Sequence, residues 1–143
     1  MSDTTITPYL DFAGRCEEAL SFYADALGAQ IETIMRFNES PDPTPPGMLQ
    51  SGFEAKVMHS SFTINGVRLM ATDGGNDQSK FDGFQLAFSV ATESEARKTF
   101  DALAAEGSVV MPLCQTFWSP CFGMVADKFN VRWMVMVPGE QPL

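Results

Sequence analysis

The stretch Lys56–Thr72, KVMHSSFTINGVRLMAT, decides the fold, because it contains two alternating segments joined by a tight turn. Apolar and polar residues alternate along 56–65, which is typical of a strand with one buried face. Asn65-Gly66 then favours a type I′ turn, in which both central residues adopt a positive φ. The alternation resumes over 67–72, so the stretch predicts a β-hairpin.

The residues before this hairpin predict a strand, a helix and a further strand. Ile6–Phe12 is rich in β-forming residues, and Pro8 confines that strand to a sheet edge or to a position whose N–H is not needed. Apolar residues at helical spacing predict a helix over 14–27, and Gly28 fits the left-handed residue that follows a helix. Residues 29–37 read as a strand. The first half therefore has the order β-α-β-β-β.

Residues 38–55 predict a long loop, because they contain four prolines and two glycines. Long loops inside compact domains are either functional lids or disordered segments. The sequence leaves both alternatives open, including a flap formed by Pro41–Gly52.

The second half predicts the same order of elements. A strand over 83–91 is followed by Thr92-x-x-Glu95, a capping box that opens a helix ending at Gly107. Three more strands are predicted over 108–115, 121–126 and 131–137, with a turn at 127–130. Neither half could cover its own sheet, so we expect a single domain, 1–143, of two modules at about 4–75 and 80–138.

Composition excludes several classes of function. The chain has 143 residues, 9 basic and 18 acidic, and a net charge of −9, which argues against nucleic-acid binding. No apolar run approaches the roughly 20 residues of a membrane span, and no signal peptide is visible, so we expect a cytoplasmic protein that binds no membrane. The three cysteines predict reduced thiols, and the single histidine, His59, excludes a multi-histidine site within one chain.

Several motifs together resemble one known group of proteins. These are Pro8-Tyr-Leu-x-Phe12-x-Gly14, Glu18-Ala-Leu-x-Phe22-Tyr23, Leu27-Gly28-Ala29, Leu69-Met-Ala-x-Asp73-Gly-Gly75, Thr116-Phe117-Trp118 and Asp127-Lys128-Phe129-x-Val131-x-Trp133. With the duplicated β-α-β-β-β order, they resemble the vicinal oxygen chelate superfamily of glyoxalases, bleomycin-resistance proteins and extradiol dioxygenases. The nearest branch is the PhnB-like one, also labelled 3-demethylubiquinone methyltransferase-like. Asn130 departs from that branch, which usually has Gly there.

The resemblance implies an α+β fold in which two paired βαβββ modules form a curved mixed sheet. Helices cover the convex face, and the concave face forms a cup for a ligand. Alternation places Phe84, Leu86, Phe88 and Val90 beneath the helices and Gln85, Ala87 and Ser89 in the cup. It likewise sends His59, Ser61, Thr63, Arg68, Met70 and Thr72 to the cup. For the first and last strands the resemblance supplies the direction: Thr7, Tyr9, Met134 and Met136 inward, Trp133 and Val135 in the core.

Metal-dependent members of the superfamily place His or Glu on the first, fourth, fifth and eighth strands. Aligned on the motifs, those positions here hold Thr7, Met70, Gln85 and Met134. Divalent Zn, Ni, Fe and Mn sites need carboxylate, imidazole or thiolate ligands. We therefore expect no metal in the usual place and no cofactor.

The remaining cup residues are candidates for binding a small molecule. His59 is a candidate base or a hydrogen-bond partner that orients a ligand, or else a strand histidine bonded to a neighbouring Ser or Thr or lying at the surface. Arg68 could clamp an acidic group or extend into solvent, and Tyr9 offers a ring with a polar tip. Trp118 and Phe122, with Phe117, form an aromatic cluster that serves a ligand, the core or a dimer interface.

These residues favour a small-molecule binding protein of the bleomycin-resistance kind. The alternatives are a lyase or isomerase with an altered metal set, and a metal-free enzyme that uses His59 as its base. A methyltransferase is a poor fit, because the sequence has no glycine-rich loop after a first strand to hold an adenosyl cofactor. The resemblance also implies a homodimer.

Overall fold

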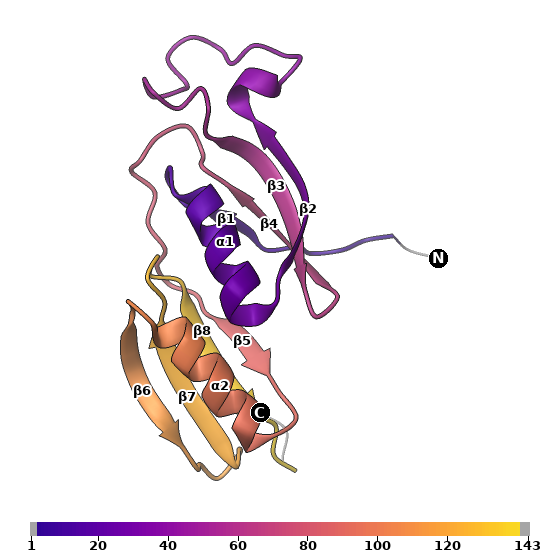
Figure 1. The fold of residues 1–143 in the computed structure, drawn as a ribbon, viewed down its shortest axis with the longest axis vertical. Helices are drawn as coiled ribbons and strands as arrows, with labels where there is room; N and C mark the ends of the chain where they lie inside the picture. Colours follow the sequence, from indigo (N-terminus) through magenta and orange to yellow (C-terminus); the bar gives the residue numbers. More distant parts are fainter. Residues whose placement is uncertain (1–2, 141–143) are drawn as a thin grey trace. The chain divides into compact units, whose positions relative to one another are not determined.

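The computed structural model describes residues 3–140 and divides the chain into two compact units, Met1–Lys80 and Phe81–Leu143. Within the described residues, each unit contains one α-helix and one four-stranded sheet. Figure 1 labels these elements. The described residues contain no helix that is long and apolar enough to cross a membrane.

The first unit consists of β1 (Tyr9–Asp11), α1 (Cys16–Leu27), β2 (Gln30–Arg36), a short 3-10 helix η1 (Phe37–Glu39), β3 (Val57–Ile64) and β4 (Val67–Thr72). The strand order in its sheet is β1-β4-β3-β2. β1 runs parallel to β4, and the other pairs are antiparallel. The predicted position of the Pro8 strand at a sheet edge is confirmed.

The second unit repeats this arrangement. Its elements are β5 (Leu86–Ser89), α2 (Glu93–Ala104), β6 (Ser108–Cys114), β7 (Cys121–Ala126) and β8 (Arg132–Val137). The strand order is β5-β8-β7-β6, with β5 parallel to β8. The predicted βαβββ order of both halves is therefore confirmed.

Local turn chemistry produces the expected chain reversals. Asn65 and Gly66 have φ values of 49° and 82°, the double positive φ that a type I′ turn needs. Gly28 ends α1 in the left-handed conformation, with φ 69°. The capping box of α2 is half formed, because Thr92 Oγ1 accepts from the Glu95 N–H at 3.1 Å, whereas the Glu95 carboxylate accepts from Ala91 N–H.

Two predicted strands are shorter in the structure. The first begins at Tyr9 and not at Ile6, although Pro8 O still accepts from Met70 N–H at 2.9 Å. β5 covers only Leu86–Ser89, the residues that pair with Trp133–Met136 of β8. The prediction that Phe84 lies beneath a helix is wrong, since 39% of Phe84 is exposed.

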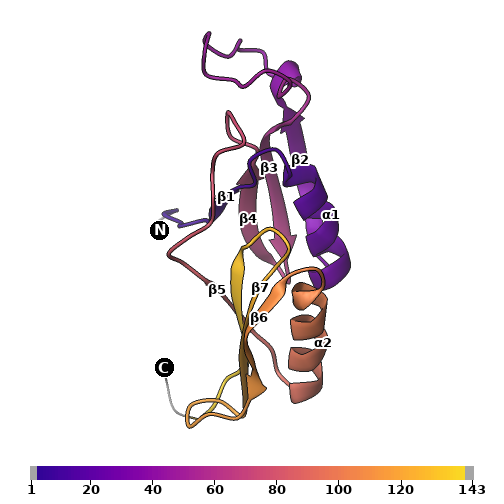
Figure 2. The same ribbon diagram turned by 90° about the vertical axis from the view of Figure 1, so that its left-hand side faces the viewer.

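One face of each sheet is packed against the helix of its own unit (Figure 2). In the first unit, Tyr23 of α1 stacks on Phe62 of β3 with ring centroids 6.2 Å apart. In the second, a Cβ on Gly123 of β7 would lie 2.7 Å from Phe100 Cε2 of α2, so glycine permits this close approach. We call the opposite side of each sheet its open face. Strand alternation puts Ser61 on the first open face and Phe122 on the second.

Candidate functional site

A buried carboxylate fixes the strands that carry the candidate residues of the first unit. Asp73 follows β4 directly and is 1% exposed. Its Oδ1 accepts from Gly14 N–H at 2.9 Å and from Cys16 N–H at 2.7 Å, at the start of α1. Its Oδ2 accepts from Val57 N–H at 2.8 Å, where β3 begins. Asp73 therefore joins the end of β4 to the starts of β3 and α1.

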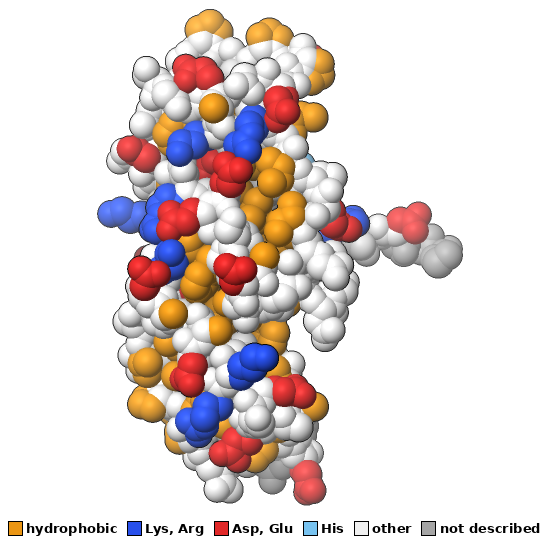
Figure 3. Space-filling view, viewed as in Figure 1, with side chains coloured by type: hydrophobic (Ala, Val, Ile, Leu, Met, Phe, Trp, Pro, Cys, Tyr) orange, Lys and Arg blue, Asp and Glu red, His pale blue; other side chains and the backbone are white. Residues whose placement is uncertain are grey.

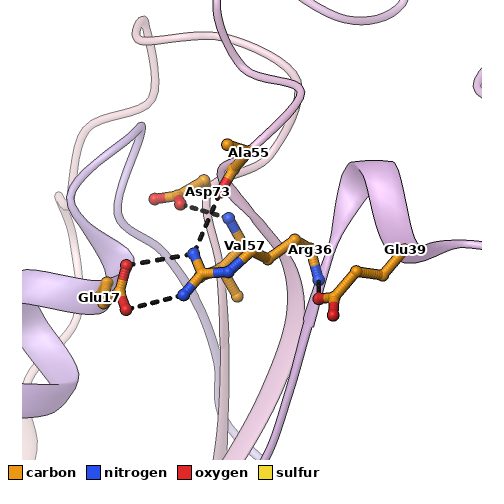
Figure 4. Close-up of polar contacts among 6 residues, drawn as sticks. All are labelled: Glu17, Arg36, Glu39, Ala55, Val57 and Asp73. Atoms are coloured by element: carbon orange, nitrogen blue, oxygen red, sulfur yellow. Dashed lines mark hydrogen bonds and ion pairs between the residues drawn. The ribbon is translucent and has the colours of Figure 1, made fainter.

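An ion pair reinforces the same corner from the surface, as Figure 4 shows. Arg36, the last residue of β2, binds both carboxylate oxygens of Glu17 on α1, at 2.8 and 3.1 Å. Its guanidinium also donates to Ala55 O at 3.0 Å. The hydrogen bonds from Arg36 hold the pKa of Glu17 below its ordinary value. Because both side chains are largely exposed, we treat this pair as orienting β2 and not as a major source of stability.

The open face of the first sheet brings together three of the predicted site residues, Tyr9, His59 and Met70. Tyr9 of β1 pairs with Met70 of β4, and Met70 pairs with Ser61 of β3. Tyr9, Met70 and Ser61 therefore lie in one row across the sheet. Thr33 of β2 continues the row, and its Oγ1 lies 3.0 Å from Ser61 Oγ. His59 lies two residues from Ser61 on the same face.

His59 and Tyr9 form the polar centre of this face. The phenol oxygen of Tyr9 lies 3.3 Å from His59 Nδ1, within hydrogen-bond distance. The two rings meet edge to face with centroids 5.7 Å apart. Within the sheet, His59 is thus bonded to Tyr9, whereas the sequence suggested a neighbouring Ser or Thr as its structural partner. Half of Tyr9 is exposed, so a small molecule can reach the pair.

Arg68 lies away from this centre. Arg68 pairs with Thr63 in the β3–β4 hairpin and forms an ion pair with Glu32 at 3.0 Å. Glu32 occupies the bulge between Ile31 and Thr33 in β2. An acidic ligand would have to displace Glu32 from Arg68. Thr7 precedes β1 and is half-buried.

The open face of the second sheet is lined with methionines. One row joins Ala87, Met134, Met124 and Met111 across β5, β8, β7 and β6. The next row joins Ser89, Met136, Phe122 and Cys114. The rings of Trp118 and Phe122 meet edge to face with centroids 5.4 Å apart, and Phe117 meets Trp118 at 4.7 Å. The predicted residues Met134, Phe122 and Trp118 thus belong to one surface.

Gln85 does not lie on a strand, contrary to the sequence prediction. It precedes β5 and is exposed. With Thr7, Met70 and Met134, it completes the set aligned with the metal ligands of the superfamily. A hydroxyl, an amide and two thioethers do not fit a divalent Zn, Ni, Fe or Mn ion. Over residues 3–140, no group of three or more His, Cys, Asp or Glu side chains is placed to hold a metal ion.

The C-terminal end of the long loop, 38–55, is held against the rest of the first unit. Gln50 N–H donates to Gly75 O at 2.7 Å, and Gln50 Oε1 accepts from Asp77 N–H at 3.0 Å. Phe53 is buried against Gly14, where a Cβ would lie 3.1 Å from the ring. Of the predicted flap, Pro41–Gly52, the end near Gln50 is therefore fixed. The proline-rich part, 41–46, is mostly exposed.

The three cysteines are free thiols, and they differ in reactivity. Burial is the main cause that raises the pKa of Cys16 to about 12, and the charge of Asp73 adds to it. Burial also raises the pKa of Cys121, whereas Cys114 is exposed. Because the thiolate is the nucleophile, burial makes Cys16 far less reactive than an exposed thiol.

We therefore expect iodoacetamide at pH 8 to alkylate one thiol of the folded chain rapidly. Mass spectrometry should locate the modification at Cys114 and find Cys16 and Cys121 unmodified until denaturant is added. The variant Cys114→Ser should lose the rapid reaction. Rapid alkylation of Cys16 in the folded chain would contradict its burial.

Sequence reasoning missed the residues that position this site. In the sequence, Asp73 stands out only as part of the Leu69–Gly75 motif, and nothing around Ser60 distinguishes it from the other residues of its strand. Ser60 is 0% exposed, and its hydroxyl donates to Ala71 O at 2.8 Å. No local sequence signal indicates the role of Glu32, because its partner Arg68 is 36 positions away.

The chain is similar in sequence to a known family of proteins. The family model described as 3-demethylubiquinone-9 3-methyltransferase matches residues 4–136. Protein YjdN of Escherichia coli (strain K12) is 34% identical over 145 residues, covering 96% of this chain and 97% of that protein.

Solved structures agree with these matches. Protein PA1353 from Pseudomonas aeruginosa is 36% identical with a TM-score of 0.83, covering 96% of this chain and 100% of that one. A putative 3-demethylubiquinone-9 3-methyltransferase, PhnB protein, from Bacillus cereus is 32% identical with a TM-score of 0.78, covering 94% and 99%. A glyoxylase/bleomycin resistance protein/dioxygenase domain from Frankia sp. EAN1pec, 16% identical with a TM-score of 0.65 and covering 96% and 99%, shares the fold.

Proposed function

Because this chain belongs to the PhnB-like family described as 3-demethylubiquinone-9 3-methyltransferase and has the glyoxalase/bleomycin-resistance fold, we propose that it is a small-molecule binding protein. The observation that carries the proposal is the Tyr9–His59 pair on an open sheet face. A phenol and an imidazole held 3.3 Å apart offer a donor and an acceptor in fixed positions. Met70, in the same row as Tyr9, adds an adaptable apolar surface beside them.

The proposed binding residues are Thr7, Tyr9, His59, Arg68 and Met70 in the first unit and Gln85, Trp118, Phe122 and Met134 in the second. On the first sheet, Tyr9 and His59 fix the orientation of a ligand and Met70 provides contact area. On the second sheet, Met134 and Phe122 provide the contact area. Arg68 takes part only when a ligand competes with Glu32 for its guanidinium. The site takes no divalent metal at the positions used by metal-dependent relatives, because the donor set there does not fit one.

The family description names a methyltransferase, but we do not propose methyl transfer. Adenosyl cofactors are commonly held at a glycine-rich turn between a parallel strand and a helix. Here β1 has three residues, and the turn from Phe12 to Arg15 is occupied by hydrogen bonds to Asp11 and Asp73. Titration calorimetry with adenosylmethionine should therefore show no binding.

The binding proposal is tested by native mass spectrometry of the freshly purified chain and by crystals grown without added ligand. We expect a species heavier than the bare chain and unassigned electron density beside Tyr9 and His59. Loss of one hydrogen bond to a ligand weakens binding by up to about tenfold. His59→Ala and Tyr9→Phe should therefore each lower the bound fraction.

The matched control is Lys98→Ala on α2, an exposed residue outside the proposed site. It should bind as the unaltered chain does. Absence of any bound species together with empty density at His59 would contradict the proposal. A tightly bound divalent ion that is lost in Gln85→Ala would contradict the metal-free site.

A second candidate function is a reaction in which His59 acts as a general base. The contact with Tyr9 favours it, because a hydrogen bond to Nδ1 orients the ring and leaves Nε2 for a substrate. The molecule identified by mass spectrometry would be the substrate to assay. Unchanged turnover in His59→Ala would exclude this candidate and leave the binding proposal standing.

A further inference from the structure

Among residues 3–140, no acceptor lies within hydrogen-bond distance of the indole N–H of Trp118. Nε1 of Trp118 is buried and has no hydrogen-bond partner among the described residues. The other tryptophan behaves differently, because Trp133 Nε1 donates to Asp127 Oδ2 at 2.9 Å. Proteins pair the large majority of buried polar side-chain atoms, so an unpaired one requires a physical explanation.

The ring contacts of Trp118 place it over the open face of the second sheet. Trp118 meets Phe122 edge to face at 5.4 Å. Phe122 lies on the open face, because its neighbour Gly123 lies against Phe100 of α2. Phe117 meets the other side of the indole at 4.7 Å and is 84% exposed, so its side chain is free to rotate away. The indole is therefore close to the surface that a ligand would use.

The sheet face beside the indole has no formal charge. Its two rows consist of Ala87, Met134, Met124, Met111, Ser89, Met136, Phe122 and Cys114, without Asp, Glu, Lys, Arg or His. Phe122 and Met136 are buried, so Met124 and Met134 are the methionines that a ligand would contact. Methionine side chains adapt their shape and make favourable sulfur contacts with aromatic rings. A charged group bound here would lose its hydration without gaining an ionic partner. The lining thus favours a flat, aromatic and uncharged molecule.

We propose that the open face of the second sheet binds an uncharged aromatic molecule that carries a carbonyl oxygen, and that Trp118 Nε1 donates to this oxygen. The ring of the ligand would lie on Met124 and Met134, and the carbonyl would complete the missing hydrogen bond. The proposal rests on the binding function proposed above, since it names the class of ligand, but it uses no residue of the first unit.

The test uses two probes of nearly equal size. Coumarin is an uncharged bicycle with a carbonyl oxygen, and naphthalene is a bicycle without an acceptor. A chain labelled with nitrogen-15 should give two indole N–H signals in a proton–nitrogen correlation spectrum, because it has two tryptophans. The signal that disappears in Trp118→Phe belongs to Trp118.

We expect coumarin to shift the Trp118 signal downfield in a saturable manner and to leave the Trp133 signal in place. Naphthalene should bind without this downfield shift. Trp118→Phe keeps an aromatic ring but removes the donor, so it should weaken coumarin binding by about tenfold and naphthalene binding by less than about twofold. Met134→Ala should weaken both probes, whereas Met48→Ala, at an exposed loop position, should change neither.

Three results would overturn the proposal. The first is a Trp118 signal that does not respond to millimolar coumarin. The second is an equal response to both probes, which would indicate an apolar surface without a donor role. The third is a signal that shifts with protein concentration alone, which would indicate that a second copy covers the indole. A ligand lost from His59→Ala, combined with no response to coumarin, would preserve the proposed function and reject only this inference.

Discussion

Replacing Asp73 with alanine is expected to lower the free energy of unfolding by roughly 3–5 kcal/mol. The substitution removes both oxygens that accept from the backbone N–H groups of Gly14, Cys16 and Val57. Asp73 is 1% exposed, so water cannot readily take its place. Native stabilities are about 5–15 kcal/mol, so this is a large fraction of the total. Urea unfolding followed by circular dichroism measures the difference.

Two further variants make this result specific to the hydrogen bonds. Asp73→Asn keeps one acceptor oxygen but turns an NH₂ group toward a backbone N–H, so an intermediate loss is expected. Asp77→Ala removes an exposed carboxylate a few residues away and should change stability by about 0.5 kcal/mol or less. If Asp73→Ala matched Asp77→Ala, the assignment of Asp73 as the anchor of α1, β3 and β4 would be wrong.

Asp127 has a comparable role in the second unit, and a double-mutant cycle can isolate it. Its Oδ1 accepts from Phe129 N–H and Val131 N–H, and its Oδ2 accepts from Trp133 Nε1 at 2.9 Å. Asp127→Asn places an NH₂ group against one of these donors, and we expect a loss of about 2–3 kcal/mol. Trp133→Phe removes the indole donor.

The double variant Asp127→Asn/Trp133→Phe should lose about 1–2 kcal/mol less than the sum of the single variants. The physical reason is that the amide then no longer faces the indole N–H. Asp82→Asn, an exposed carboxylate of the same unit, should be additive with Trp133→Phe. Strict additivity for Asp127 as well would show that its contact with Trp133 contributes nothing to stability.

The parts of the fold that local chemistry dictates could be predicted from the sequence. Asn65-Gly66 adopts the two positive φ values that its composition favours, and β4 covers Val67–Thr72 as its alternation predicts. A local sequence pattern does not show where the pairing between two strands ends, however. The alternation over 83–91 extends beyond Leu86–Ser89, the residues that pair with β8, and the predicted strand was therefore too long.

In the candidate site, too, the local features could be predicted from the sequence and the contacts between distant residues could not. Strand alternation predicted that His59 and Met70 share a face, because the direction of side chains in a strand is a local property. For Tyr9 the family resemblance supplied the direction. The register that brings Tyr9 to His59 is not local, because the two residues are 50 positions apart. Asp73 shows the same limit, since a turn-forming aspartate becomes a buried anchor only when Gly14, 59 positions away, reaches it.

The division into two units also separates the chromophores of the protein. Both tyrosines, Tyr9 and Tyr23, belong to the first unit, and both tryptophans, Trp118 and Trp133, belong to the second. Emission excited at the red edge of the absorption band thus reports only on the second unit, and the ultraviolet difference signal of the phenols reports on the first. One denaturation experiment recorded at two wavelengths can therefore reveal whether the duplicated halves melt together or one after the other.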